Sequence, residues 1–118
     1  MSDLAPHIYR QRLLIEGNYE IDVRVETVHK FFSALLSGLG AHAAGEAIVN
    51  SSPGQGKPEN QGIEAFIPLI ESGVALYTWQ SSRFISLIIY TCKAFDEDKA
   101  KSIVTDFFQL SEMESKSF

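Results

Sequence analysis

Cysteine, basic residues and long hydrophobic runs are all scarce in this sequence. Cys92 is the single cysteine among 118 residues, so no internal disulfide can form and we expect a reducing, cytoplasmic setting. The chain has 10 Lys and Arg against 15 Asp and Glu, a net charge of −5, which disfavours nucleic acid and anionic membranes as partners. No apolar run is long enough to span a bilayer, and the first residues show no signal-peptide pattern.

Motifs for metals and nucleotides are also missing. The lone cysteine and three scattered histidines, His7, His29 and His42, lack the spacing of metal ligands, so no metal site is expected. The glycines of residues 50–62 do not form a phosphate-binding loop, because they lack a Gly-Lys-Ser/Thr end and no helix follows. We expect this stretch to be an exposed, mobile loop, with a lid over a substrate as the alternative.

What the sequence does contain is typical of one globular domain covering residues 1–118. Hydrophobic residues make up 45% and charged residues 21%, which is enough for a core without disulfides. Periodicity and turn residues predict five strands and two helices. The strands are predicted at residues 8–15, 45–50, 63–70, 74–79 and 84–92, and the helices at residues 23–39 and 97–110. The polar tail, residues 111–118, is expected to fray.

The order of these elements predicts the fold class. Consecutive strands with short connections favour antiparallel pairing, and both helices have an apolar stripe at spacings of three and four residues. Two such helices can cover one face of a sheet. We therefore expect an α+β two-layer sandwich, with a mostly antiparallel sheet and two helices packed on one face.

The hairpin between residues 71 and 92 brings polar side chains together. If Ser81 and Ser82 form the turn, Tyr77 faces Ser86 and Cys92 lies opposite Glu71. Ser72 then lies within about 5–8 Å of Cys92 at the backbone.

Ser72, Tyr77 and Cys92 could form one cluster at the sheet. Strand parity places Ser72 on the face opposite to Tyr77, unless the strand breaks near Gly73. A structural interpretation stays open for each residue: Cys92 as a small core residue, Ser72 as a turn residue and Tyr77 as packing.

The same segment resembles the core of the prokaryotic, pyruvoyl-dependent S-adenosylmethionine decarboxylases, as a divergent member of that family would. That family has Glu-Ser-His, then His-Thr-Trp-Pro-Glu, then Thr-Cys-Gly. The corresponding residues here begin at Glu71-Ser72, Tyr77-Thr78-Trp79 and Thr91-Cys92, and the serine-to-cysteine separation is the same. A weaker similarity extends over most of the chain.

The resemblance implies self-processing and decarboxylation in polyamine biosynthesis. By this resemblance the chain would be cleaved between Glu71 and Ser72, and Ser72 would become a pyruvoyl group that accepts electrons during loss of carbon dioxide. Cys92 takes the role of proton donor, since a thiol is mostly protonated at neutral pH. Glu71 and Trp79 are implied to contact a small-molecule substrate, although Trp79 could equally be a core aromatic. The family also implies a homodimer.

Several positions depart from the family pattern. The family histidine that helps remove the α-proton is Tyr77 here, and an ordinary phenol is a poor base at pH 7. The histidine after the serine is Gly73, an upstream serine aligns near Glu64, and an acidic residue that contacts substrate aligns with Ser81. None of the three histidines stands at a position that obviously replaces these losses.

Three functions therefore stay open from the sequence. The chain could be a working S-adenosylmethionine decarboxylase. It could be a pyruvoyl decarboxylase of another amino acid, such as ornithine or arginine. It could also be an unprocessed family member that acts as a binding or regulatory subunit. Retention of Glu71, Ser72 and Cys92 favours the first two functions, and loss of the histidine favours the third.

Overall fold

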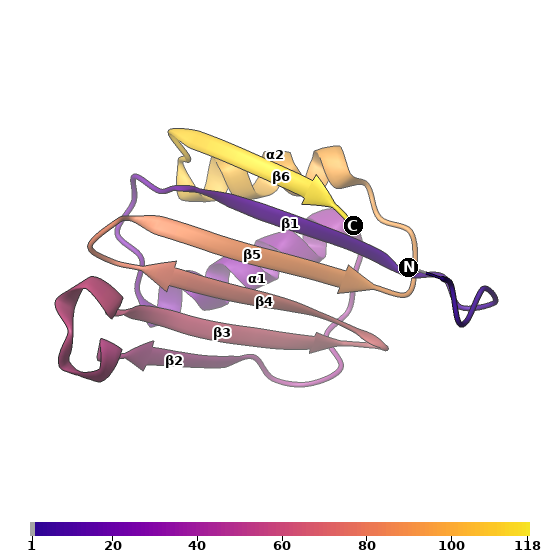
Figure 1. Cartoon of the computed structure of the whole chain (residues 1–118), viewed down its shortest axis with the longest axis horizontal. Helices are drawn as coiled ribbons and strands as arrows, with labels where there is room; N and C mark the ends of the chain where they lie inside the picture. The colour runs from indigo at the N-terminus through magenta and orange to yellow at the C-terminus, as the bar shows by residue number, and fades with distance from the viewer. Residues whose placement is uncertain (1) are drawn as a thin grey trace.

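The computed structural model describes residues 2–118 as one antiparallel sheet with helices behind it (Figure 1). The sheet has six strands in the order β2-β3-β4-β5-β1-β6, and every pair of neighbours is antiparallel. The strands are β1 (Gln11–Asn18), β2 (Ile48–Ser52), β3 (Gly62–Leu69), β4 (Ser72–Trp79), β5 (Phe84–Thr91) and β6 (Glu112–Ser117). The helices are α1 (Val25–Leu39) and α2 (Glu97–Phe108), and two short 3-10 turns occupy Gly54–Gly56 and Pro58–Asn60.

Both helices cover the same face of the sheet (Figure 1). The aromatic side chain of Phe31 in α1 packs against Phe108 in α2, with ring centroids 4.7 Å apart. Apolar side chains of α1 recur every three or four residues and are buried against the strands, as the periodicity predicts. The predicted fold class, an α+β two-layer sandwich with two helices on one face, is therefore confirmed.

The alternation of burial along β4 and β5 defines two faces of the sheet. Val74 and Leu76 in β4, like Leu87 and Ile89 in β5, are buried beneath the helices. The intervening residues lie on the opposite face, which we call the open face because no helix covers it. A side chain's position along a strand thus decides which face it occupies.

The tail and the loop differ from the sequence prediction. Residues 111–118 were expected to fray, but β6 pairs with β1 from Leu13 to Asn18. All residues of this strand are exposed, so its sequence lacks the alternation of apolar and polar residues from which a strand can be predicted. Backbone hydrogen bonds hold it against β1. In the predicted loop, β2 continues to Ser52. Among residues 2–118, no helix is both long and apolar enough to cross a membrane.

Candidate functional site

A two-residue turn joins β3 to β4 and places Glu71 directly before the first residue of β4, Ser72. Tight hairpin turns of this length need a positive φ, and Glu71 supplies it with φ 59°. A residue with a Cβ pays about 1–2 kcal/mol for this left-handed conformation, and glycine usually occupies it. Glu71, at the predicted cleavage site, thus holds local backbone strain.

Cys92 reaches across to this turn from the end of β5. Its backbone N–H donates a hydrogen bond to Ser72 Oγ at 3.0 Å, and its thiol donates to the carbonyl oxygen of Glu71 at 2.9 Å. The predicted hairpin register is confirmed, since Tyr77 pairs with Ser86 and Cys92 lies beside Glu71. The two groups that would react, the serine oxygen and the preceding carbonyl, are thus both held by one residue.

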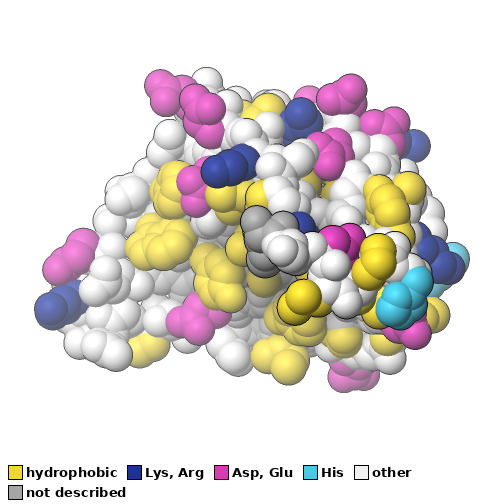
Figure 2. Space-filling model, turned by 45° about the vertical axis from the view of Figure 1, so that its right-hand side comes forward, with side chains coloured by type: hydrophobic (Ala, Val, Ile, Leu, Met, Phe, Trp, Pro, Cys, Tyr) yellow, Lys and Arg dark blue, Asp and Glu magenta, His cyan; other side chains and the backbone are white. Residues whose placement is uncertain are grey.

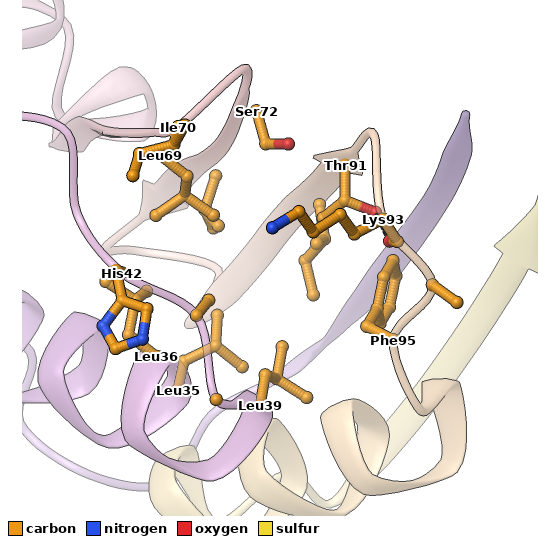
Figure 3. A pocket seen from close by; sticks show the side chains of 15 residues that line it. Leu35, Leu36, Leu39, His42, Leu69, Ile70, Ser72, Thr91, Lys93 and Phe95 are labelled. Carbon is orange, nitrogen blue, oxygen red and sulfur yellow. Dashed lines mark hydrogen bonds between the residues drawn. The ribbon is translucent and has the colours of Figure 1, made fainter. Parts of the chain in front are cut away.

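Ser72 faces the helix side of the sheet and opens into a cavity of about 160 Å³ (Figure 3). The cavity lies between the C-terminal end of α1 and the segment that follows β5. We call it the Ser72 cavity, and its labelled walls are Leu35, Leu36, Leu39, His42, Leu69, Ile70, Thr91, Lys93 and Phe95. A second, shallower hollow on the open face also touches Ser72, beside Phe66 and Tyr90.

Tyr77 does not join this cluster. It lies five residues along β4 from Ser72, about 16 Å at the usual rise of a strand. It is on the open face, where 42% of its surface is exposed, whereas Ser72 faces the helices. The parity of the strand, which no break at Gly73 interrupts, causes this separation. Its cross-strand neighbour on β3 is Glu64, another position that departs from the family pattern.

Trp79, a predicted substrate contact, and Gly73, a departure from the family pattern, both have clear positions. Trp79 ends β4 and packs against Phe84, with ring centroids 5.6 Å apart. It is seven residues from Ser72 on the same strand, so its predicted contact with substrate stays a prediction. Gly73 stands where the family has histidine, and a Cβ there would come within 2.6 Å of the Phe66 ring. Glycine at this position therefore fits the packing of the open face.

Sequence reasoning missed Lys93 and His42, which both line the Ser72 cavity. His42 follows the end of α1 by three residues, and only the turn after the helix brings it near β4. Lys93 could have been noticed, because it replaces the glycine of the family's Thr-Cys-Gly motif.

The fold and the site together define a class of small α+β sandwiches. In this class a serine stands at one end of a hairpin, and a thiol donates a hydrogen bond to the carbonyl that precedes the serine. The sequence profile of the family described as S-adenosylmethionine decarboxylase matches residues 16–118. This chain belongs to that family.

Comparison with solved structures agrees in fold. The crystal structure of the adenosylmethionine decarboxylase from Aquifex aeolicus VF5 matches with a TM-score of 0.73 and 14% sequence identity. The match covers 94% of this chain and 89% of that chain. No curated protein matches the sequence.

The side chains present fit a pyruvoyl group formed from Ser72. Such a group needs a serine directly after a reactive carbonyl, a hydrogen-bond donor to that carbonyl and space beside the serine. Cys92 and the Ser72 cavity supply the second and third of these. Within residues 2–118, no three His, Cys, Asp or Glu side chains form a group that could hold a metal ion.

Proposed function

We propose that the chain cleaves itself between Glu71 and Ser72 and becomes a pyruvoyl-dependent decarboxylase of polyamine biosynthesis. Membership of the S-adenosylmethionine decarboxylase family supports this function. The observation that carries it is the pair of hydrogen bonds from Cys92, one to the Ser72 oxygen and one to the Glu71 carbonyl oxygen.

The first step of cleavage follows from these contacts. Ser72 Oγ attacks the carbonyl carbon of Glu71, a C–O bond forms, and the C–N bond of the peptide breaks to leave an ester and a free amine. Negative charge develops on the carbonyl oxygen during the attack, and the thiol of Cys92 already donates to that oxygen. A donor fixed in advance stabilises such an oxyanion. Strain at Glu71 raises the energy of the unbroken turn and favours the same step.

The second step removes the α-proton of Ser72 and breaks the bond between its Cβ and the ester oxygen. The backbone carboxylate of Glu71, now the C-terminus of the first fragment, is the leaving group. Water then converts the resulting dehydroalanine to the pyruvoyl group and ammonia. Tyr77 cannot act as the base within one chain, since it lies on the other face. We therefore expect this proton transfer to limit the rate of cleavage.

The pyruvoyl group, once formed, supplies a carbonyl that can take up the electron pair left by departing carbon dioxide. Cys92 is the protein's own contribution at this stage. Its thiol lies at the carbonyl of Glu71, the residue before Ser72, and from there can return a proton to the substrate carbon. Glu71, at the new C-terminus, and Trp79 are the proposed substrate contacts.

Denaturing mass spectrometry of purified protein tests the proposed cleavage. We expect fragments of residues 1–71 and 72–118, the second bearing a pyruvoyl group, and no fragments from Ser72→Ala. A wild-type chain that stays intact on prolonged incubation at neutral pH would contradict self-cleavage. Release of carbon dioxide from S-adenosylmethionine, ornithine and arginine would then identify which of these amino acids, if any, the processed protein accepts.

A second candidate function is an unprocessed binding or regulatory subunit. The observation that favours it is the position of Tyr77, which lies on the face of the sheet opposite to Ser72. An intact chain in the mass spectrum would support this candidate.

We also propose that the protein is a cytoplasmic homodimer. The open face of the sheet exposes Phe66, Tyr77 and Tyr90, each about two-fifths accessible. Figure 2 shows hydrophobic side chains gathered on the visible surface, with single charged side chains among them. An uncovered apolar sheet face of this kind is a candidate for a second copy, and family members are oligomeric. If Tyr77 takes part in cleavage, it must then act on Ser72 of the other copy in the dimer.

A further inference from the structure

The second step of the proposed cleavage needs a base that can reach the α-proton of Ser72, and Tyr77 lies on the other face of the sheet. Two of the residues that line the Ser72 cavity carry a nitrogen that can accept a proton, Lys93 and His42 (Figure 3). No Asp or Glu is among the residues that line it. On this face of the sheet the base is therefore either an amine or an imidazole.

Lys93 lies beside Ser72 along the backbone. The N–H of Cys92 donates to Ser72 Oγ at 3.0 Å, and Lys93 is the next residue, with its Cα about 3.8 Å from that of Cys92. The flexible four-carbon stem of a lysine can span the gap that remains. Figure 3 shows the amine of Lys93 pointing into the cavity. The α-carbon of Ser72 is two bonds from its hydroxyl oxygen, so a group that reaches this hydroxyl also comes close to the α-proton.

His42 lies on the opposite wall of the cavity. The next residue, Ala43, forms a bridge with Leu69, and Leu69 pairs in turn with Ser72. Two strand spacings, about 10 Å, thus separate the backbone next to His42 from Ser72. Figure 3 shows the imidazole beside Leu36 of α1, away from the serine. Its position makes His42 the less suitable of the two bases.

The other titratable groups near Ser72 are less suitably placed than Lys93. Glu71 and Tyr90 line the hollow on the open face, whereas the side chain of Ser72, which would carry the ester, faces the helices. The thiol of Cys92 already donates to a carbonyl oxygen. Lys93 takes part in none of the ion pairs found within residues 2–118. Its exposure lets the ammonium that forms return a proton to water.

We propose that the amine of Lys93 is the base that removes the α-proton of Ser72 after the ester has formed. The proton passes to Nζ, and the electron pair of the C–H bond forms the double bond between Cα and Cβ. The Cβ–O bond breaks and releases the backbone carboxylate of Glu71, and Lys93 then loses its proton to water. This assignment rests on the proposed function. It concerns a step that precedes substrate binding, so it places no limit on the substrate.

The half-time of cleavage and the amount of ester test this assignment. Wild type, Lys93→Met, Lys93→Arg and Lys93→His are incubated at neutral pH, and hydroxylamine is added to native samples at intervals before denaturing mass spectrometry. Hydroxylamine splits the ester and leaves a hydroxamate at the end of the fragment 1–71, whereas an unreacted peptide bond stays intact.

We expect Lys93→Met and Lys93→Arg to cleave about a hundredfold or more slowly than the wild type, because a positioned base contributes at least this factor. Both variants should accumulate the ester, since attack by Ser72 continues while elimination is blocked. An arginine keeps the positive charge but cannot accept a proton, so it separates a base from a mere charge. Lys93→His restores a base and should regain part of the rate.

Lys116→Met is the matched control, because Lys116 lies on the exposed edge strand β6 and its loss should leave the half-time unchanged. Cleavage of Lys93→Met or Lys93→Arg at the wild-type rate would overturn the assignment. Slow cleavage of Lys93→Met without accumulated ester would also overturn it, because the block would then precede elimination. Accumulation of ester in His42→Gln but not in Lys93→Met would give the role to His42 instead.

A failure of the proposed function gives a different result from a failure of this assignment. A wild-type chain that neither cleaves nor yields a hydroxamate would refute self-cleavage and the role of Lys93 together. A wild-type chain that cleaves, combined with any of the contrary outcomes for the variants, would refute the role of Lys93 alone.

Discussion

At the scale of single residues, the site depends on two features next to the peptide bond between Glu71 and Ser72. Glu71 adopts a positive φ in a tight turn, and Cys92 holds both the carbonyl of Glu71 and the hydroxyl of Ser72. The thiol and the backbone N–H of Cys92 have separate partners. Their contributions can therefore be separated by substitution, because the N–H is retained in every variant.

Cys92→Ala should slow self-cleavage by about tenfold or more, because it removes a donor to the developing oxyanion. Cys92→Ser keeps a hydrogen-bond donor in a similar position, so it should cleave more slowly than the wild type and faster than Cys92→Ala. The half-time of cleavage, followed by mass spectrometry after a pulse of cell-free synthesis, measures the effect. Equal half-times for Cys92→Ala and the wild type would show that the thiol plays no part in the attack.

At the scale of elements, β6 is attached to the sheet without burying any apolar side chain. Its backbone pairs with β1, and Ser117 donates a hydrogen bond to Glu97 at the start of α2. Gln11 of β1 donates to the same carboxylate at 2.9 Å. Glu97 therefore connects β1, α2 and β6, and the docking of β6 rests on polar contacts that respond to pH.

Protonation of Glu97 should destabilise this connection. Its pKa lies below the ordinary value of 4.5, first because of the hydrogen bond from Ser117 and then because of that from Gln11. A carboxyl whose pKa is lowered on folding adds stability above its unfolded pKa, and this stability is lost as the pH falls through the folded pKa.

Glu97→Gln should reduce the urea midpoint of unfolding at pH 7, and the difference from wild type should shrink as the pH is lowered below about 4.5. A neutral amide accepts weaker hydrogen bonds than a carboxylate does, so the contacts with Gln11 and Ser117 lose strength. Glu112→Gln, an exposed change on β6, serves as the control. A difference in midpoint that is constant from pH 7 to pH 3 would contradict the assigned role of the carboxylate.

At the scale of the whole molecule, the two faces of the sheet are unequally covered. Helices bury one face, and the open face keeps Phe66 and Tyr90 accessible, at 43% and 39% of their surfaces. The separation of Tyr77 from Ser72 belongs to this scale too, since the two side chains lie on opposite faces. Assembly through the open face would cover these side chains.

Phe66→Glu and Tyr90→Glu should each convert the proposed dimer to a monomer, because a buried, unpaired carboxylate is costly at an interface. Sedimentation velocity measures the change, and Leu4→Glu, at a highly exposed apolar residue before the first strand, should leave the dimer intact. A wild-type chain that sediments as a monomer at high concentration would refute the dimer.

Much of the fold could be predicted from the sequence, because local patterns report local structure. The periodicity of three and four residues predicted α1 and α2, and the run of mostly apolar and β-branched residues at 84–92 predicted the strand β5. The same patterns failed for β6. Its pairing is made by backbone groups, and an exposed edge strand has no buried side to reveal in its sequence.

The sequence by itself determined the serine, the cysteine and their separation, since hairpin register follows from turn length and a period of two. It left open whether Ser72 and Tyr77 share a face, and the unbroken strand β4 decided that they do not. Only the tertiary structure decided that the Cys92 thiol meets the Glu71 carbonyl, and that Lys93 and His42 share a cavity with Ser72. Those contacts join segments from α1, β4 and the end of β5, and their geometry depends on how helices and sheet pack together.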